Sequence, residues 1–124
     1  SASKTLAVVF AEEDTLFRLM EMALLRKLTP QGEKTLTYFF GPEFSRPLDD
    51  LMTMGDRLGL PRDVRTTVCQ DDAELDRALP ECDALVLERS EMTAKRLEAC
   101  AKRIKLIQQF GTDYRHIDVE TARS

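Results

Sequence analysis

Short apolar runs alternate along this chain with longer segments in which apolar residues recur at the spacing of a helix. Five of the runs predict strands, at residues 6–10, 36–40, 64–69, 83–87 and 104–110. A continuous apolar run such as LAVVF at residues 6–10 is typical of a strand that is buried on both faces. Strands that alternate with helix-length segments predict an α/β domain with a mainly parallel sheet.

Local signals predict where the first two helices begin and end. Asp14 can cap a helix after residues 6–10, and the turn Thr29-Pro30-Gln31-Gly32 is expected to end it. Pro47 suits the first position of the next helix, because its fixed φ is helical and its missing N–H is not needed there. Gly59 suits the residue just past the end of that helix.

Two more helices are predicted in the second half of the chain. Asp71 and Glu74 have the spacing of a capping box, and Pro80 is expected to close the short helix that they begin. Thr93 can cap the last of the four helices, which precedes the strand at residues 104–110.

Right-handed crossovers between parallel strands place helices on both faces of such a sheet. We therefore predict a flavodoxin-like, three-layer domain with a mainly parallel five-stranded sheet in the order 2-1-3-4-5. A chain of 124 residues is long enough for one hydrophobic core, so residues 1–124 are expected to form a single domain.

Composition and charge exclude several classes of partner. The net charge of −4 argues against a nucleic acid or an anionic membrane surface as the main partner. No apolar run approaches the ~20 residues that a membrane span requires. The cysteines, Cys69, Cys82 and Cys100, form no CxxC pair, so we expect buried reduced thiols and a cytoplasmic protein.

Ligands of parallel α/β sheets bind outside the carboxyl ends of the strands. Two segments that follow predicted strands carry distinctive chemistry there: Arg89-Ser90 and the loop that begins at Gly111. Arg89 offers a planar fork of donors for a carboxylate or phosphate, and the glycine lets backbone N–H groups approach an anion. The alternative is a surface arginine, a serine that caps a helix, and an ordinary turn.

The sequence lacks the motifs of several other sites. It contains no GxGxxG and no GxxxxGK[ST], so we expect no nucleotide cofactor to bind to this chain. His116, the only histidine, has no serine or cysteine placed to form a catalytic triad, and no cluster of metal ligands is evident. We therefore predict no catalytic residue and no metal site.

A longer pattern resembles a known family. DALVLERS at residues 83–90 is followed by Met92-Thr93, by LEA at residues 97–99, and by IKLIQQFGTDYRHIDVETAR at residues 104–123. This order of strand, Arg-Ser, helix, strand, glycine loop and Ile-Asp helix entry resembles the N-terminal substrate (catalytic) domain of the D-isomer-specific 2-hydroxyacid dehydrogenases.

The resemblance implies a function and a set of site residues. The parent would be an NAD(P)-dependent oxidoreductase acting on the CH-OH group of 2-hydroxy acids. Substrate-binding residues carried over from the family are Arg89, Ser90, Gly111, Thr112 and Asp113. Asp113 departs from the family, which has a second glycine there. Its carboxylate is expected to weaken binding of a substrate carboxylate unless a cation pairs with it.

The resemblance also implies a missing part. In the family, the helix that begins near Ile117-Asp118 leads into the nucleotide-binding domain, which carries the glycine-rich loop and the catalytic residues. Residues 1–124 are therefore expected to be the N-terminal part of a longer two-domain enzyme. This piece would be inactive by itself, and its parent would bind NAD or NADP and form a homodimer.

Two alternatives stay open. The first is a degenerate receiver-like signalling domain, because residues 8–14 (VVFAEED) resemble an acidic receiver pocket, with Glu88 at the phosphoacceptor position. Neither the usual aspartate at that position nor a lysine after residues 104–110 is present. The second is an interaction domain with no ligand.

Overall fold

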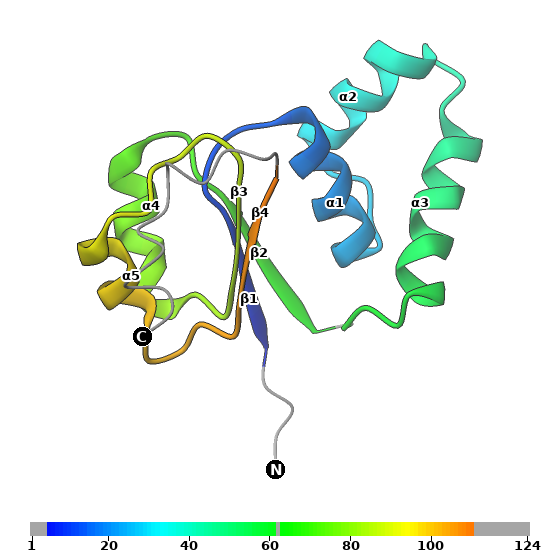
Figure 1. The fold of residues 1–124 in the computed structure, drawn as a ribbon. Coiled ribbons are helices and arrows are strands. Elements are labelled where there is room, and N and C mark those ends of the chain that lie inside the picture. Colours follow the sequence, from blue (N-terminus) through cyan, green and yellow to red (C-terminus); the bar gives the residue numbers. More distant parts are fainter. Residues whose placement is uncertain (1–4, 62, 111–124) are drawn as a thin grey trace. The chain divides into compact units, whose positions relative to one another are not determined.

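The computed structural model describes residues 5–61 and 63–110 (Figure 1). The elements in chain order are β1 (Leu6–Phe10), α1 (Thr15–Leu25), α2 (Pro30–Phe40), α3 (Ser45–Arg57), β2 (Val64–Val68), α4 (Asp72–Ala78), the 3₁₀ helix η1 (Leu79–Glu81), β3 (Ala84–Leu87), α5 (Ala94–Cys100) and β4 (Leu106–Gln109). They form two compact units, a helical unit (residues 14–64) and a sheet unit (residues 5–13 and 65–110). Of the helices described, none is both long enough and apolar enough to span a membrane.

The sheet unit is built around the pairing of β1 with β3. Among the described residues the sheet has four strands in the order β2-β1-β3-β4. β3 pairs in parallel with β1 on one side and with β4 on the other, so Val9, Leu85 and Ile107 lie in register across three strands. The predicted α/β, flavodoxin-like class with a mainly parallel sheet is confirmed.

The predicted strand at residues 36–40 is wrong, because these residues form the second half of α2. The side chain of Thr29 accepts a hydrogen bond from the Gly32 N–H at 3.0 Å, and Pro30 occupies the first turn. The turn predicted to end a helix therefore begins one. A cap and proline at the start outweigh the strand preference of the aromatic and β-branched residues that follow.

The predicted strand order is also corrected. It inserted residues 64–69 between β1 and β3, whereas β2 lies on the outer side of β1 and β3 pairs with β1 directly. The side chains of β2 alternate between half-buried and exposed, while those of β3 are almost all buried. An alternating strand fits an edge of the sheet, and an apolar strand fits its centre.

Several predicted helix boundaries are confirmed by side-chain caps. Asp14 accepts from the Leu16 N–H at 2.8 Å, Asp71 from the Glu74 N–H at 2.8 Å, and Thr93 from the Arg96 N–H at 3.2 Å. Gly59 follows α3 with a positive φ of 67°, as predicted.

Two boundaries differ from the prediction. α3 begins at Ser45, so Pro47 lies within its first turn rather than at its first position. α1 ends at Leu25, because Arg26 adopts a left-handed conformation with a φ of 53°. The backbone there turns before the predicted stop at residues 29–32.

The core of the sheet unit lies between one face of the sheet and the helices α4, η1 and α5, which occupy the same side in Figure 1. It includes all of the cysteines, which are buried and form no disulfide, as predicted. Burial raises the pKa of the Cys69 thiol to about 11 and that of Cys82 to about 12, and it also raises the pKa of Cys100. These thiols stay protonated near neutral pH and pack as small apolar side chains.

Asp83, the first residue of the DALVL run, joins strands at the amino end of β3. Its carboxylate is buried and accepts hydrogen bonds from the Ala7 N–H at 2.8 Å and from Arg103 at 3.1 Å. Its backbone N–H donates to the Ala7 carbonyl, and its carbonyl accepts from the Lys105 N–H. The bond from Ala7 lowers the pKa of Asp83, and Arg103 acts in the same direction.

In the helical unit, α3 approaches α1 closely at Gly55. A β-carbon at this position would lie 2.5 Å from the Ala23 carbonyl oxygen. Arg26 fixes the same contact, since its guanidinium donates to the carbonyls of Gly55 and Leu60 at 2.9 and 2.7 Å. The ends of α1 and α3 are therefore held together by the Arg26 side chain, and Gly55 has no space for a side chain.

We expect Gly55→Ala to destabilise the helical unit. The steric conflict should cost roughly 1–3 kcal/mol, as overpacked sites usually do, although alanine is about 1 kcal/mol better than glycine within a helix. Urea unfolding measures the difference. Thr53→Ala, at an exposed position of the same helix, should leave stability unchanged or slightly higher, and a Gly55→Ala variant as stable as the parent would contradict the close approach.

We expect Asp83→Asn to destabilise the sheet unit in a pH-dependent way. Because the folded-state pKa is lowered, ionised Asp83 stabilises the fold fully above the unfolded-state pKa of about 3.9. That contribution is lost as the pH falls through the folded-state pKa. Urea unfolding across a pH series should therefore show a gap between wild type and variant that closes below about pH 4. Asp50→Asn, at an exposed position of α3, should show no such gap.

Candidate functional site

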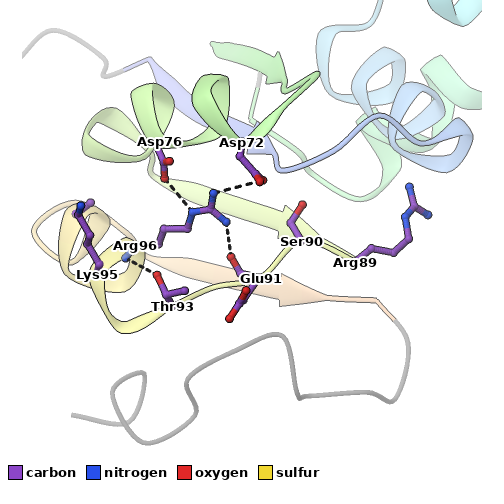
Figure 2. Close-up of a pocket in the computed structure, with 9 residues that line it drawn as sticks. Asp72, Asp76, Arg89, Ser90, Glu91, Thr93, Lys95 and Arg96 are labelled. Carbon is purple, nitrogen blue, oxygen red and sulfur yellow. Dashed lines mark hydrogen bonds and ion pairs between the residues drawn. The ribbon is translucent and has the colours of Figure 1, made fainter.

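The segments after β1 and β3 meet because these neighbouring strands are parallel and end at the same edge of the sheet. The Ala11 N–H donates to the Val86 carbonyl at 2.8 Å, close to the point where both strands end. Beside this point is a cavity of about 630 Å³, which Figure 2 shows between α4, the segment after β3 and the start of α5. Its lining is mostly charged and consists of Asp72, Asp76, Arg89, Ser90, Glu91, Thr93, Lys95, Arg96 and Ala99.

The carboxylate of Glu12 is surrounded by donors from the segment after β3. It accepts the backbone N–H groups of Glu88, Arg89 and Ser90, the last two at 2.7 Å, and also the Ser90 hydroxyl. Successive N–H groups that converge in this way form an anion-binding nest. In this chain the anion in the nest is the protein's own side chain.

Ser90 and Arg89, both predicted from the sequence, lie together at the cavity but play different parts. The Ser90 hydroxyl contacts the Glu12 carboxylate and, at 3.3 Å, the Ala11 carbonyl. Its proton is therefore donated within the nest. The Arg89 side chain is 61% exposed, and Figure 2 shows it directed away from Arg96. Its guanidinium donates to the Glu13 carbonyl at 3.3 Å and lies 3.8 Å from the Glu88 carboxylate. Arg89 thus combines a fixed backbone with a charged group that reaches solvent.

Arg96 crosses the cavity and links α5 to α4. Its guanidinium pairs with Asp76 at 2.8 Å and Asp72 at 3.3 Å, and it donates to the Glu91 carbonyl at 2.6 Å (Figure 2). The bond to Asp76 raises the pKa of Arg96 and lowers that of Asp76. All three nitrogens of this guanidinium have acceptors within the protein, so Arg96 is a structural link rather than a ligand-binding cation.

The other predicted site residues, Gly111, Thr112 and Asp113, lie outside the described residues. The residues just before them, Gln109 and Phe110, are hydrogen-bonded to the end of β3 and to the residue that follows it. The Phe110 N–H donates to the Leu87 carbonyl at 2.9 Å, and the Gln109 side chain donates to the Glu88 carbonyl at 2.7 Å. That the loop meets Arg89 and Ser90 at one edge of the sheet stays a prediction.

The sequence reasoning missed the roles of Glu12 and Arg96. The sequence pattern indicates Glu12 only as part of an acidic receiver-like pocket, and nothing local reveals that its partners lie more than seventy residues away. The role of Arg96 is indicated in part by the sequence, because Asp72 and Asp76 are four residues apart and share one face of α4, where one cation can pair with both.

Neither a metal ion nor a dinucleotide fits the described residues well. Within residues 5–61 and 63–110, no group of three or more His, Cys, Asp and Glu side chains is arranged to hold a metal. The receiver-like alternative requires the acidic turn to bind a cation, yet Glu12 accepts four hydrogen bonds from the protein. The turn at residues 11–14 also suits no pyrophosphate, because it has two glutamates and no glycine.

Comparison with known proteins identifies the family. The model of the D-isomer specific 2-hydroxyacid dehydrogenase catalytic domain matches residues 46–124, which is more than half of the chain. A search of curated proteins gives no match. The matched span includes β3, Arg89 and Ser90, and the segment that begins at Gly111. The chain therefore belongs to the D-isomer specific 2-hydroxyacid dehydrogenases, a family of oxidoreductases, and carries its catalytic domain.

Proposed function

We propose that this chain is the substrate domain of an NAD(P)-dependent enzyme that interconverts 2-hydroxy acids and 2-oxo acids. Residues 1–124 hold the acid, and a separate nucleotide-binding domain of the same protein supplies the nicotinamide. The family match supports the reaction class. The charge and position of Arg89 support the role of this domain in it.

The observation that carries the proposal is the geometry of Arg89. Its backbone is held at the carboxyl end of β3 through the N–H that Glu12 accepts, while its guanidinium extends into solvent. A guanidinium matches the planar geometry of a carboxylate, and every 2-hydroxy or 2-oxo acid carries one. Ser90 stands beside it with a hydroxyl oxygen that can accept a further hydrogen bond.

Gly111, Thr112 and Asp113 complete the proposed site. Their backbone N–H groups would also donate to the substrate carboxylate, as the family resemblance implies. The supporting observation is that Phe110, the residue before them, is hydrogen-bonded to the Leu87 carbonyl at the end of β3. Two segments that leave adjacent parallel strands start only about 4.8 Å apart.

The hydride must come from outside the described residues. The turn after β1 does not suit a dinucleotide, so the cofactor, NAD or NADP, is assigned to the second domain and this chain alone is inactive. Buried reduced thiols support a cytoplasmic location. The family resemblance supports a homodimeric parent.

The proposal is tested with the full-length protein that contains this chain. Incubation of the protein with NADH or NADPH and a panel of 2-oxo acids should oxidise the cofactor, which absorbance follows. Acetoacetate, whose carbonyl is one carbon further from the carboxylate, serves as the matched control and should react far more slowly. If no 2-oxo acid is reduced with either cofactor, the proposal is wrong.

We expect Arg89→Gln to weaken substrate binding in that enzyme. Hydrogen bonds to charged groups contribute about 1.5–3 kcal/mol, so KM for the 2-oxo acid should rise roughly tenfold or more. Lys102→Gln removes an exposed cation that follows α5 and does not line the cavity, and it should leave KM unchanged. Equal effects of the two substitutions would show that Arg89 acts only through net charge.

We expect Asp113→Gly to strengthen substrate binding. The substitution restores the glycine of the family pattern and removes a carboxylate that repels the substrate carboxylate. At surface dielectric such repulsion is on the order of 1 kcal/mol or more, so KM should fall about fivefold. Asp113→Asn separates the two effects, since it removes the charge and keeps a side chain. An unchanged KM in both variants would exclude Asp113 from the site.

A further inference from the structure

The strongest unexplained feature of the sheet unit is the set of donors around Glu12. Three consecutive N–H groups, from Glu88 to Ser90, and the Ser90 hydroxyl all point to one carboxylate. These bonds are charge-assisted, which makes them shorter and stronger than bonds between neutral groups. Glu12 lies outside the family match to residues 46–124, so the match gives it no role.

The same segment is also held from the side of β4. The Gln109 side-chain amide donates to the Glu88 carbonyl at 2.7 Å and to the Phe110 carbonyl at 3.0 Å. Glu12 binds the N–H groups of the segment, and Gln109 binds one of its carbonyls. Both strands beside β3 thus contribute a side chain that fixes the backbone at Glu88.

The turn that carries Glu12 is itself anchored. The next residue, Glu13, accepts the side-chain amide of Gln70 at 3.1 Å, and its carbonyl accepts from the Arg89 guanidinium at 3.3 Å. The Ala11 carbonyl lies 3.3 Å from the Ser90 hydroxyl. The contact between Glu12 and the Glu88–Ser90 segment is therefore made by two segments that are each held at the edge of the sheet.

We propose that Glu12 is a positioning residue of the substrate site, acting through the backbone from which Arg89 extends. The carboxylate fills the nest permanently and holds the Glu88–Ser90 segment in the geometry that binds a substrate carboxylate. This inference rests on the proposed function for the identity of the ligand. The nest itself rests on the contacts alone.

The chemistry of the nest requires a carboxylate. All of its members are donors, and a carboxylate presents only acceptors. Glutamine at position 12 would offer one acceptor oxygen and would turn an N–H₂ group toward N–H groups, so at least one donor would lose its partner. Removal of the whole side chain, as in Glu12→Ala, would leave an anion site that a small carboxylate can enter.

The test uses the full-length protein with Glu12→Gln, Glu12→Ala and the matched control Glu98→Gln, at an exposed position of α5 that does not line the cavity. The first readout is the amide NMR signals of Glu88, Arg89 and Ser90. We expect these three to shift in both Glu12 variants and to stay unchanged in Glu98→Gln. In Glu12→Ala, added formate should return them toward their wild-type positions in a saturable way. In Glu12→Gln the amide occupies the nest, so formate should have no effect.

The second readout is the kinetics with the best 2-oxo acid of the panel. We expect KM to rise about tenfold in Glu12→Ala with a much smaller change in kcat, and formate to reverse most of that rise. Formate should not lower KM in the wild type. A merely structural role would lower the amount of folded enzyme without a rescue that depends on formate.

The outcomes separate the two proposals. If the three amide signals do not respond to Glu12 substitutions, or if they respond while KM in an active enzyme does not, the positioning role is wrong. If the amide signals shift and formate returns them, but the wild-type protein reduces no 2-oxo acid, the proposed function is wrong. The positioning role in substrate binding is then wrong as well. Agreement of both readouts supports both proposals.

Discussion

The parallel pairing of β1 with β3 is the contact on which the sheet unit depends. Both strands are almost entirely apolar, so the pair is stable only at the centre of the sheet, with β2 and β4 at its edges. Because the strands run in the same direction, their amino ends share one edge of the sheet and their carboxyl ends share the other. The polar contacts at the two ends of the pair follow from this pairing.

At each end of the pair, a carboxylate next to one strand accepts one or more backbone N–H groups from the other strand or from the segment after it. At the amino end Asp83 accepts the Ala7 N–H, and this contact is purely structural. At the carboxyl end Glu12 accepts three N–H groups from the segment that carries Arg89. The two contacts use the same chemistry, but only the second fixes a residue, Arg89, whose side chain is exposed to solvent at the carboxyl edge of the sheet.

This arrangement keeps the backbone around Arg89 in one conformation through contacts within the protein. A loop that must order itself on binding loses affinity, whereas a loop already held by its neighbours does not. Here the backbone at Glu88 is fixed from β1 by Glu12 and from β4 by Gln109. Arg96, held by Asp72 and Asp76, stabilises the wall of the adjacent cavity. In the function proposed above, such a surface would present the acid to a cofactor held by another domain.

The sequence by itself determined the features that depend on neighbours along the chain. These are the helix caps at Asp14, Asp71 and Thr93, the apolar strands β1 and β3, the α/β class, and the motif around Arg89 that marks the family. Only the tertiary structure decided the strand order and the partners of Glu12. The helical state of residues 36–40 follows from the local cap at Thr29 and from Pro30, which the sequence pattern indicated as a helix end. Caps and apolar runs act within a few residues, so a linear pattern displays them. The pairing of β1 with β3 and the nest join residues more than seventy positions apart, and their energy depends on a geometry that no local pattern encodes.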